Sequence, residues 1–366
     1  MEIRTDSELG RSLLTERGMQ WLHAHSGDPY ARLLRAEDED RRALGAQIRE
    51  LGPLYRSRTG AWVTGSGVLG AEILRDPRLE PLAPYVGRAQ LTTVDADGPA
   101  LPGPAARDAE RLCGEALGRT AGGFDLVSDV LRPVVVRLTG ELLAVPPERR
   151  GTFERLCGAV APALDAGLCP PTLPRARALI DAVEGLRSLL AESAGPRDAR
   201  MRACVVGVEV TTNVVANAML ALLERPEQWR LVCDDPRRAE AAVEETLRCD
   251  PPVRLDGRVA REDLELAGRT VTAGDEVVVH IEAANQDAGP SRDPERFDLR
   301  RATATGHLCL LEGTRFGAVA PQVRIFGAAV LRALAARAPD LRRTGSVVRR
   351  LRAPVTQAVV RFPVAA

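Results

Sequence analysis

The sequence predicts a mainly α-helical protein with a small β region. Helical periodicity runs through most of the 366 residues, and its strongest stretch, Pro196–Glu224, is apolar on nearly all sides and therefore typical of a buried helix. Strand-like segments are concentrated between Arg258 and Ile281, with turns expected at Gly268 and Gly274. A chain of this length can bury a substantial core, and we expect residues 1–366 to form a single domain.

The N-terminal part of the chain, residues 1–52, is predicted to be helical. Apolar residues recur at helical spacing up to Leu22, the segment Ser26–Tyr30 interrupts the pattern, and a further helix ends near Leu51. A short hairpin should follow, with strands at Tyr55–Arg58 and Ala61–Thr64.

The middle of the chain predicts helices separated by proline-rich breaks. Ser66 is expected to cap a helix that ends near Arg75, and the proline- and glycine-rich stretch Leu79–Pro104 is expected to be an irregular loop. The helices predicted after it are Ala105–Thr120, Phe124–Val145, Arg150–Ala166, Arg175–Ser193 and, near the C-terminus, Val323–Ala338.

Composition excludes several classes of function. The formal charge is zero and the sequence pI is about 6.9, so there is no electrostatic footprint for nucleic acid. Seven cysteines without a C-x-x-C pair favour reduced thiols in the cytoplasm, and Met1–Gly10 does not resemble a signal peptide. The apolar run Cys204–Leu223 contains Glu209, Asn213 and Asn217, so we expect no membrane span.

No constellation of catalytic or metal-binding residues is evident. The histidines and serines form no nucleophile–base–orienter set, and no phosphate-binding glycine motif is present. His23 and His25, which have no third ligand nearby, are weak evidence for zinc and are expected on the surface. His280 is expected to be a packed strand residue. Glu245 and Arg248, spaced i and i+3, predict an ion pair that is structural rather than catalytic.

The stretch from His307 to Arg324 resembles the haem-binding loop of the cytochrome P-450 monooxygenases. Against that family's pattern, H-L-x-F-G-x-G-x-H-x-C-L-G-A-P-x-A-R, the matching residues are His307, Leu308, Gly313, Ala320, Pro321 and Arg324. The pair Glu245 and Arg248 matches the family's E-x-x-R. The resemblance covers the chain from about Tyr55 to the end, and it implies a P-450-like fold whose roof is shortened before the long central helix.

Two departures from the family pattern remove its oxygen chemistry. Gly317 stands where the resemblance places the iron-ligating cysteine, and Cys309 lies too far upstream to replace it. Val210 stands at the threonine that relays protons to bound dioxygen. We therefore expect no haem, with Gly313, Arg315, Gly317 and Arg258 as a vestigial haem site.

The fate of this vestigial site is open at the sequence level. Arg258 and Arg315 could hold an anionic ligand where the haem would be, or they could be paired with carboxylates of the chain itself. Leu310 and Leu311, which replace the family's Phe-Gly pair, favour a site that side chains have filled.

The N-terminal stretch resembles the haem-free auxiliary proteins that accompany deoxysugar glycosyltransferases in macrolide and anthracycline pathways of actinomycetes. This resemblance implies a non-catalytic protein that binds, stabilises and activates a nucleotide-deoxysugar glycosyltransferase as a hetero-oligomer. We expect Leu13, Met19, Trp21 and Tyr30 to contact this partner. The alternative is that these residues pack the N-terminal helix onto its own core.

Two other functions are consistent with parts of the sequence. One is a scaffold that recruits a different biosynthetic protein, such as a carrier domain. The other is a haem monooxygenase with an unusual iron ligand, which Gly317 and Val210 together disfavour. The N-terminal resemblance favours the glycosyltransferase auxiliary over the scaffold.

Overall fold

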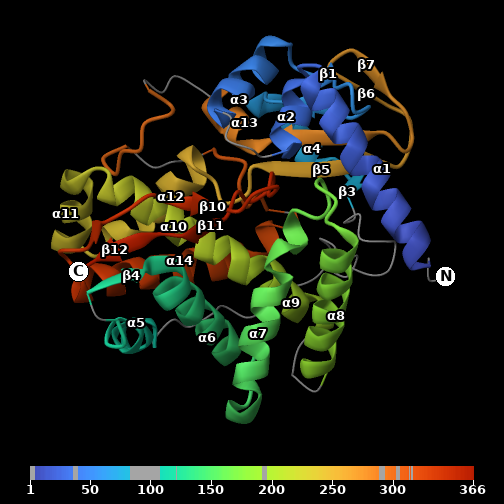
Figure 1. Ribbon diagram of the computed structural model, residues 1–366. Coiled ribbons are helices and arrows are strands. Elements are labelled where there is room, and N and C mark those ends of the chain that lie inside the picture. The colour runs from blue at the N-terminus through green and yellow to red at the C-terminus, as the bar shows by residue number, and fades with distance from the viewer. Residues whose placement is uncertain are drawn as a thin grey trace.

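Helices dominate the fold, with small sheets packed at their edges (Figure 1). The computed structural model describes residues 5–35, 40–82, 108–120, 122–191, 196–287, 293–301, 306–312, 314 and 316–366. The prediction of a mainly α fold with a small β region is confirmed. Gly313, Arg315 and most of the predicted loop Leu79–Pro104 lie outside the described residues.

Three helices form the N-terminal segment: α1 (Asp6–His25), α2 (Pro29–Arg35) and α3 (Arg41–Glu50). A reciprocal cap begins α1, because the Glu8 backbone donates to the Thr5 hydroxyl and the Thr5 backbone donates to the Glu8 carboxylate. The turn between α1 and α2 is held by Asp28, whose carboxylate accepts from the backbone N–H groups of Ala31 and Arg58 at 2.9 and 2.8 Å. The predicted helical N-terminus and its break are therefore both present.

The largest sheet has five strands in the order β1-β2-β8-β5-β3. Only the β2–β8 pairing is parallel among these strands, and the predicted hairpin is the antiparallel β1–β2 pair. Its strands are β1 (Tyr55–Arg56), β2 (Trp62–Thr64), β3 (Leu79–Pro81), β5 (Leu255–Ala260) and β8 (Glu276–His280).

The remaining strands form three small sheets, ordered β4-β12-β9, β10-β11 and β6-β7. The predicted turns at Gly268 and Gly274 are present, and both glycines have the positive φ that residues with a Cβ rarely adopt. The strands are β4 (Gly123–Asp125), β6 (Leu264–Leu266), β7 (Arg269–Val271), β9 (Arg342–Arg343), β10 (Val348–Arg349), β11 (Val359–Arg361) and β12 (Pro363–Ala365).

Most predicted helices are present, with two local differences. Phe124 does not begin a helix but lies in β4, because Gly123–Asp125 pairs with β12. Ser66 is at the N-cap of α4, but its side chain makes no capping bond; Asp287 accepts from the Gly67 backbone N–H at 2.9 Å instead. The helices are α4 (Gly67–Arg75), α5 (Ala109–Leu117), η2 (Leu126–Leu131), α6 (Arg132–Leu142), η3 (Pro147–Arg149), α7 (Arg150–Val160), η4 (Ala161–Leu164), α8 (Leu173–Leu189), α11 (Pro226–Asp234), α12 (Arg238–Cys249) and α13 (Ile281–Asp287).

The predicted long central helix is continuous from α9 (Arg197–Arg202) through the π-helical turn η5 (Ala203–Gly207) into α10 (Val208–Leu223). It packs against α14 (Ala320–Arg337), which follows the short turn η6 (Gly317–Val319). Two helical stretches, Arg197–Leu223 and Gly317–Arg337, are long and apolar enough to cross a membrane, but their apolar windows are 89% and 72% buried inside the molecule. Burial of this extent is typical of helices in the core of a folded protein.

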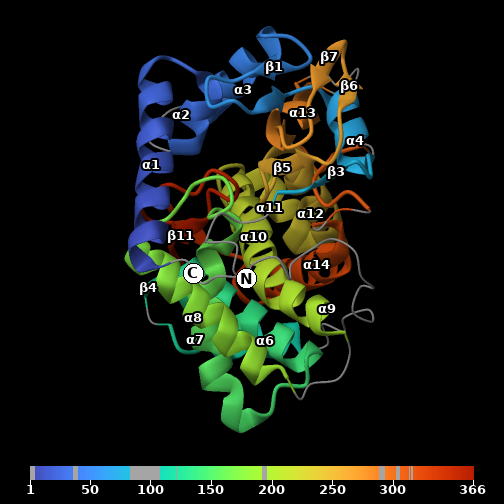
Figure 2. The same ribbon diagram turned by 90° about the vertical axis from the view of Figure 1, so that its right-hand side faces the viewer.

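Helix α1 connects two regions that are far apart in sequence. Figure 2 shows it running along one side of the molecule, from the level of α2 and α3 down to α8. The Gln20 side chain donates to the Leu168 carbonyl at 2.8 Å, and Arg17 donates to the Pro170 carbonyl at 3.2 Å. The N-terminal helix therefore holds the chain segment that leads into α8.

Candidate functional site

Position 317, where the family resemblance places an iron ligand, has no room for a side chain. A Cβ built on Gly317 would lie 2.0 Å from the Leu311 carbonyl oxygen and 2.8 Å from its carbonyl carbon. The loop is held in this shape by Thr314, whose hydroxyl donates to the Leu311 carbonyl at 2.8 Å and accepts from the Gly317 N–H at 3.0 Å. Both the missing ligand atom and the local backbone therefore oppose thiolate ligation here.

Cys309 does not replace the missing ligand. It is buried in the main core, and burial raises the pKa of its thiol to about 12. A haem ligand of this type must be a thiolate, and a thiol with this pKa stays protonated at neutral pH. The preceding histidine, His307, is also engaged, because its Nε2 lies 3.1 Å from a Glu244 carboxylate oxygen.

The central helix packs directly against α14 close to this loop. A Cβ on Gly207 would lie 2.2 Å from Oε1 of Gln322, so the glycine lets this side chain lie against the helix backbone. The Gln322 amide donates to the Thr139 hydroxyl and to the Ala203 carbonyl at 3.1 and 3.3 Å. Val210, at the proton-relay position, is fully buried in the core. Between the central helix and α14, side chains of the protein itself make the contact.

Glu209, next to the relay position, is held in ion pairs. Its carboxylate lies 2.7 Å from the Arg132 guanidinium and 2.9 Å from that of Arg350. Burial would raise the pKa of Glu209, but the two guanidiniums outweigh burial and hold this pKa below its usual range. Glu209 is therefore an ionised structural group and a poor proton donor. Taken together, the residues present do not fit a thiolate-ligated haem centre.

The loop is anchored to α12 by Glu244, a residue that sequence analysis did not select. Its carboxylate contacts His307 at 3.1 Å and Arg324 at 2.5 Å. Burial opposes ionisation of Glu244, but the hydrogen bonds from His307 and Arg324 prevail and lower its pKa to about 2. Both ends of the His307–Arg324 stretch thus meet at one carboxylate of α12. No sequence signal could have identified it, because ionisable pairs between distant segments leave no local pattern.

The ion pair predicted between Glu245 and Arg248 is present. Two parallel hydrogen bonds of 2.8 Å join the guanidinium to the carboxylate. Arg248 also donates to the Pro294 and Arg296 carbonyls, and Glu245 accepts from the Asp298 N–H at 2.9 Å. The pair therefore ties residues 293–301 to α12.

Arg258, at the position that the resemblance assigns to a haem propionate, has a partner within the chain. It is buried, and its Nη2 lies 3.0 Å from Oδ2 of Asp256. Of the two interpretations left open for Arg258, this contact favours pairing with a carboxylate of the chain over a bound anion. Leu310 is buried in the main core and Leu311 packs against it, as expected for a filled site.

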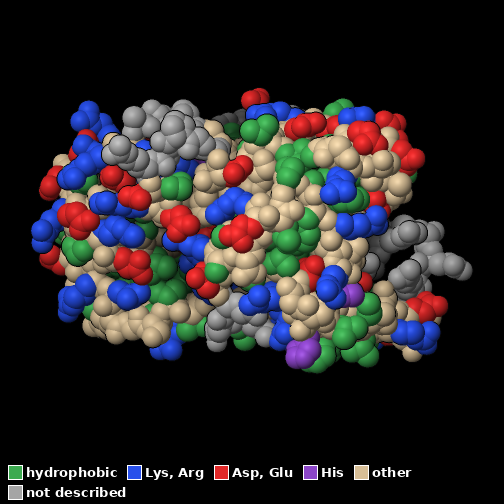
Figure 3. All heavy atoms as spheres, turned by 90° about the horizontal axis from the view of Figure 1, so that it is seen from above, with side chains coloured by type: hydrophobic (Ala, Val, Ile, Leu, Met, Phe, Trp, Pro, Cys, Tyr) green, Lys and Arg blue, Asp and Glu red, His purple; other side chains and the backbone are tan. Residues whose placement is uncertain are grey.

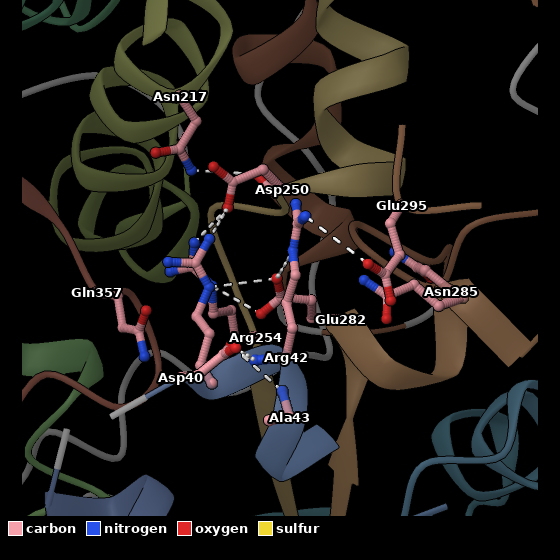
Figure 4. Close-up of polar contacts among 12 residues, drawn as sticks. Asp40, Arg42, Ala43, Asn217, Asp250, Arg254, Glu282, Asn285, Glu295 and Gln357 are labelled. Atoms are coloured by element: carbon pink, nitrogen blue, oxygen red, sulfur yellow. Dashed lines mark hydrogen bonds and ion pairs between the residues drawn. The ribbon is translucent and has the colours of Figure 1, made fainter. Parts of the chain in front are cut away.

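A network of buried charges fixes the N-terminal segment to the rest of the fold. Figure 4 shows Asp250 and Arg254, from the connection between α12 and β5, converging with Glu282 of α13. Arg254 lies 3.1 Å from Glu282 and also contacts Asp250. Arg41, on α3, bridges the same two carboxylates at 3.0 and 3.3 Å, and Arg349 adds a contact of 3.4 Å to Asp250. The position of α3 is therefore set by charges from three distant parts of the chain.

Two of the four residues predicted to contact a partner are buried, which corrects that prediction. Leu13 is 2% exposed because it packs with Leu9 into the cluster formed by α6, α7, α8 and η5. Tyr30 is 1% exposed and belongs to the main core. For these two, the alternative of core packing holds. Met19 and Trp21 are 43% and 51% exposed.

Sequence analysis missed two other exposed apolar residues of α1. Leu14 is 72% exposed and Leu22 is 52% exposed, and they lie on the side of the helix that carries Trp21. The spacing i, i+7, i+8 would have grouped these three residues on one face. We call Leu14, Trp21 and Leu22 the α1 apolar surface; Met19 is also exposed, but it lies nearly opposite Trp21 around the helix.

The face of the molecule seen in Figure 3 is mixed in charge. Figure 3 shows arginines and carboxylates interspersed over one face, with histidine side chains beside hydrophobic ones at its edge. His25 stacks on Trp21 with ring centroids 5.3 Å apart, and His23 is partly exposed on the same helix. No cluster of three potential metal ligands occurs in the part of the chain that the structure describes.

Comparison with known proteins places the chain in a family. Residues 239–304 match the family described as Cytochrome P450. Protein AknT of Streptomyces galilaeus is 40% identical, with 98% of this chain and 96% of AknT aligned. Protein DesVIII of Streptomyces venezuelae is also 40% identical, over 98% of this chain and 94% of that protein.

Two further comparisons name the family directly. Cytochrome P450 family protein EryCII of Saccharopolyspora erythraea is 32% identical, with 97% of each chain aligned. The ligand-free crystal structure of CYP164A2 from Mycobacterium smegmatis superposes with a TM-score of 0.74 at 27% identity, covering 92% of this chain and 99% of that one. The full-length match and the shared fold lead to one conclusion: this chain belongs to the cytochrome P450 family.

Proposed function

We propose that this chain is a non-catalytic auxiliary protein that binds, stabilises and activates a nucleotide-deoxysugar glycosyltransferase in the cytoplasm, during glycosylation of a polyketide antibiotic. The observation that carries the proposal is the backbone around Gly317, which leaves no space for a ligating side chain while the rest of the P450 fold is kept. A fold kept without its metal site is expected to act through its surface.

The full-length relatives support this proposal. AknT, DesVIII and EryCII align over nearly their whole lengths, and they come from actinomycetes, as the resemblance of the N-terminal stretch predicts. A partner that binds only the folded transferase stabilises it by mass action, and it can also shift the transferase toward its active conformation.

We place part of the transferase contact on the α1 apolar surface. Its three side chains are exposed, lie on a helix that is anchored by Leu9 and Leu13 on its other side, and include a tryptophan. Tryptophan is enriched among the residues that dominate interface energies. The helix is therefore rigidly held while it presents apolar groups to solvent.

Co-expression with the cognate transferase tests the proposal. We expect a stable hetero-oligomer on size-exclusion chromatography and a higher transferase activity than without this chain, which alone should transfer no sugar. Trp21→Ala should raise the Kd of the complex by at least about 30-fold. This factor corresponds to the loss of about 2 kcal/mol of binding free energy, which is typical of a hot-spot residue. Because Trp21 is half exposed, the melting temperature of the isolated variant should not change.

Leu351→Ser is the matched control for Leu14→Ser, because Leu351 is 69% exposed and Leu14 is 72% exposed. Only Leu14→Ser should weaken the complex. If both variants bind normally, the contact lies elsewhere on the molecule. If the transferase is equally soluble and active without this chain, the auxiliary function is wrong and the scaffold becomes the better hypothesis.

A further inference from the structure

Gly18 lies in the middle of α1, and no contact within the described part of the chain accounts for a glycine there. The residue is exposed, and a Cβ built on it would meet no atom within 4 Å. Unlike Gly27, whose φ is 85°, Gly18 has no positive φ that would favour glycine. Glycine inside a helix makes the helix less stable than alanine does. The missing side chain therefore leaves an opening on the solvent side of α1 that the fold of this chain does not use.

The α1 apolar surface surrounds this opening. Leu14, Gly18 and Leu22 are spaced by four residues, and Trp21 lies three residues after Gly18, so all four share one face of the helix. When two helices pack closely, a side chain of one inserts between four residues of the other, which are neighbours on its surface at positions i, i+3, i+4 and i+7. Leu14, Arg17, Gly18 and Trp21 have this spacing, and the glycine leaves the floor between them open.

The walls of the opening are held in place. The Trp21 ring stacks on the His25 imidazole, with centroids 5.3 Å apart and planes 6° apart. Nη1 of Arg17 donates to the Pro170 carbonyl at 3.2 Å, and Leu13 fixes the opposite side of the helix in the core. A segment that docks here meets side chains that are already ordered, which lowers the entropy cost of binding.

The charges beside this surface are positive, and none of them meets a carboxylate among the described residues. Arg11 is exposed and makes no ion pair there. The Nε and Nη2 atoms of Arg17 have no partner in the same part of the chain and are not buried. Burial lowers the pKa of Arg17, the nearby guanidiniums of Arg352 and Arg175 lower it further, and Cys169 opposes this shift. A surface with accessible, uncompensated guanidiniums attracts carboxylates.

We propose that a helix of the glycosyltransferase docks along α1, with a large apolar side chain inserted over Gly18 and with Asp or Glu side chains facing Arg11 and Arg17. This inference rests on the proposed function and adds the kind of segment that the partner contributes, an acidic amphipathic helix. The opening at Gly18 matches an inserted side chain, and the arginines match carboxylates beside it. A second copy of this chain is a poor occupant, because both copies would contribute arginines to the contact.

Gly18→Leu tests the opening. The new side chain would enter open space and leucine favours a helix more than glycine does, so the isolated variant should melt no lower than the wild type. In the complex it would take the place of the partner's side chain, and the Kd for the purified cognate transferase should rise at least about tenfold. Gly151→Leu is the matched control and should bind like the wild type, because Gly151 of α7 is also helical and exposed with no atom near a Cβ. Equal binding by Gly18→Leu and the wild type would overturn the proposal.

Arg11→Gln/Arg17→Gln tests the charge of the docked segment. At about 50 mM NaCl the Kd should rise about fivefold, and the difference from the wild type should shrink at about 0.5 M NaCl, because salt screens exposed charges. The control Arg230→Gln/Arg269→Gln removes the same charge from exposed positions outside α1 and should change neither the Kd nor its salt dependence. An unchanged or lower Kd for Arg11→Gln/Arg17→Gln would show that the docked segment is not acidic and would overturn the proposal.

Photocrosslinking identifies the occupant. Thr15 is exposed and follows Leu14, so Thr15→p-benzoylphenylalanine places a photoreactive ring beside the opening without filling it. Mass spectrometry of the irradiated complex should recover a transferase helix that carries Asp or Glu beside its apolar residues. A crosslink to a basic segment or to a second copy of this chain would contradict the proposal. So would binding of the wild type to phosphatidylserine vesicles that Arg11→Gln/Arg17→Gln abolishes while the transferase complex keeps its Kd, since a lipid surface would then be the occupant.

The proposed function and this inference fail in different ways. If the wild type forms no complex and does not raise transferase activity, the proposed function is wrong and the inference falls with it. If the complex forms and the transferase is activated, but Gly18→Leu and Arg11→Gln/Arg17→Gln both bind like the wild type, only the inference is wrong. The transferase then contacts another surface of this chain.

Discussion

At the scale of single residues, the loss of haem chemistry involves more than one exchanged ligand. Gly317 lacks the sulfur atom, and the loop around it has closed onto the space that a Cβ would need. Cys309, the nearest thiol in sequence, is buried with a raised pKa. The chain has therefore adapted its backbone to glycine, and a single reversion should not restore the metal site.

Gly317→Cys tests this adaptation. The new Cβ would collide with the Leu311 carbonyl, which is backbone and cannot rotate away, so the variant should lose on the order of 1–3 kcal/mol of stability. Neither the wild type nor the variant should show the reduced carbon-monoxide band of a thiolate haem after expression with added haem precursor. A stoichiometric haem with that band in either protein would contradict the haem-free interpretation.

Arg248 is predicted to be needed for folding. Arg248→Ala would leave Glu245 buried without its bidentate partner, at a cost of about 3–5 kcal/mol. Urea unfolding should show this loss, or the variant should aggregate on expression. Arg237→Ala is the control, because its side chain is 90% exposed and the loss of its solvent-screened ion pair with Asp235 should leave the free energy of unfolding essentially unchanged. Equal stability of the two variants would refute a structural role for the Glu245–Arg248 pair.

At the scale of secondary-structure elements, α1 has two faces with different roles. Leu9, Leu13 and Ala24 attach it to the body of the protein, while Leu14, Trp21 and Leu22 face solvent. On the inward side, Gln20 donates to the Leu168 carbonyl at 2.8 Å. One helix is thus fixed to the body of the protein on its inner side and presents apolar side chains to solvent on its outer side.

The contact between β8 and α3 should make stability depend on pH. His280 packs against α3, where a Cβ on Gly45 would lie 3.0 Å from the imidazole. Burial lowers the pKa of His280 to about 4; the nearby arginines at 254, 49 and 41 add to this effect, and Glu282 opposes it. The unfolded chain takes up a proton below a pKa of about 6.5, whereas the folded chain does so only near 4, so stability falls as the pH falls between these values.

We expect this histidine to account for on the order of 3 kcal/mol of the stability lost between pH 7 and pH 4. Urea unfolding of the wild type and of His280→Leu at both pH values measures it, and the variant should lose correspondingly less. His25→Leu, on exposed α1 surface, should lose as much as the wild type. If His280→Leu loses as much as the wild type, the histidine is not held neutral by the fold.

At the scale of the whole molecule, the P450 fold is held together by contacts between distant protein segments. Along the central helix, contacts are made between protein groups, such as Gln322 against Gly207 and Glu209 against two arginines. The buried charges around Asp250 bring α3 and the C-terminal strands to one point. These internal contacts hold the elements in place beneath the surface on which we propose that a partner binds.

The sequence by itself determined the fold class, the family and the loss of the iron ligand. These properties follow from local periodicity and from motifs with fixed spacing, such as His307 to Arg324 and the pair Glu245 and Arg248. The turns at Gly268 and Gly274 were predictable for the same reason, whereas the helix start at Phe124 was wrong because a distant strand, β12, pairs with this segment. Leu14 and Leu22 could also have been assigned to one face of α1 from their spacing alone.

Only the tertiary structure decided which of these residues are exposed and which charges meet. Tyrosine is a residue type that is common at interfaces. Tyr30 nevertheless lies in the core, because α2 packs against α1. Glu244 is tied to Arg324, 80 residues away, and Glu16 faces a cavity that it shares with Glu276. Burial and pairing depend on which distant segments are brought together, and the free energy of ionising a carboxylate depends on that environment rather than on its neighbours in sequence.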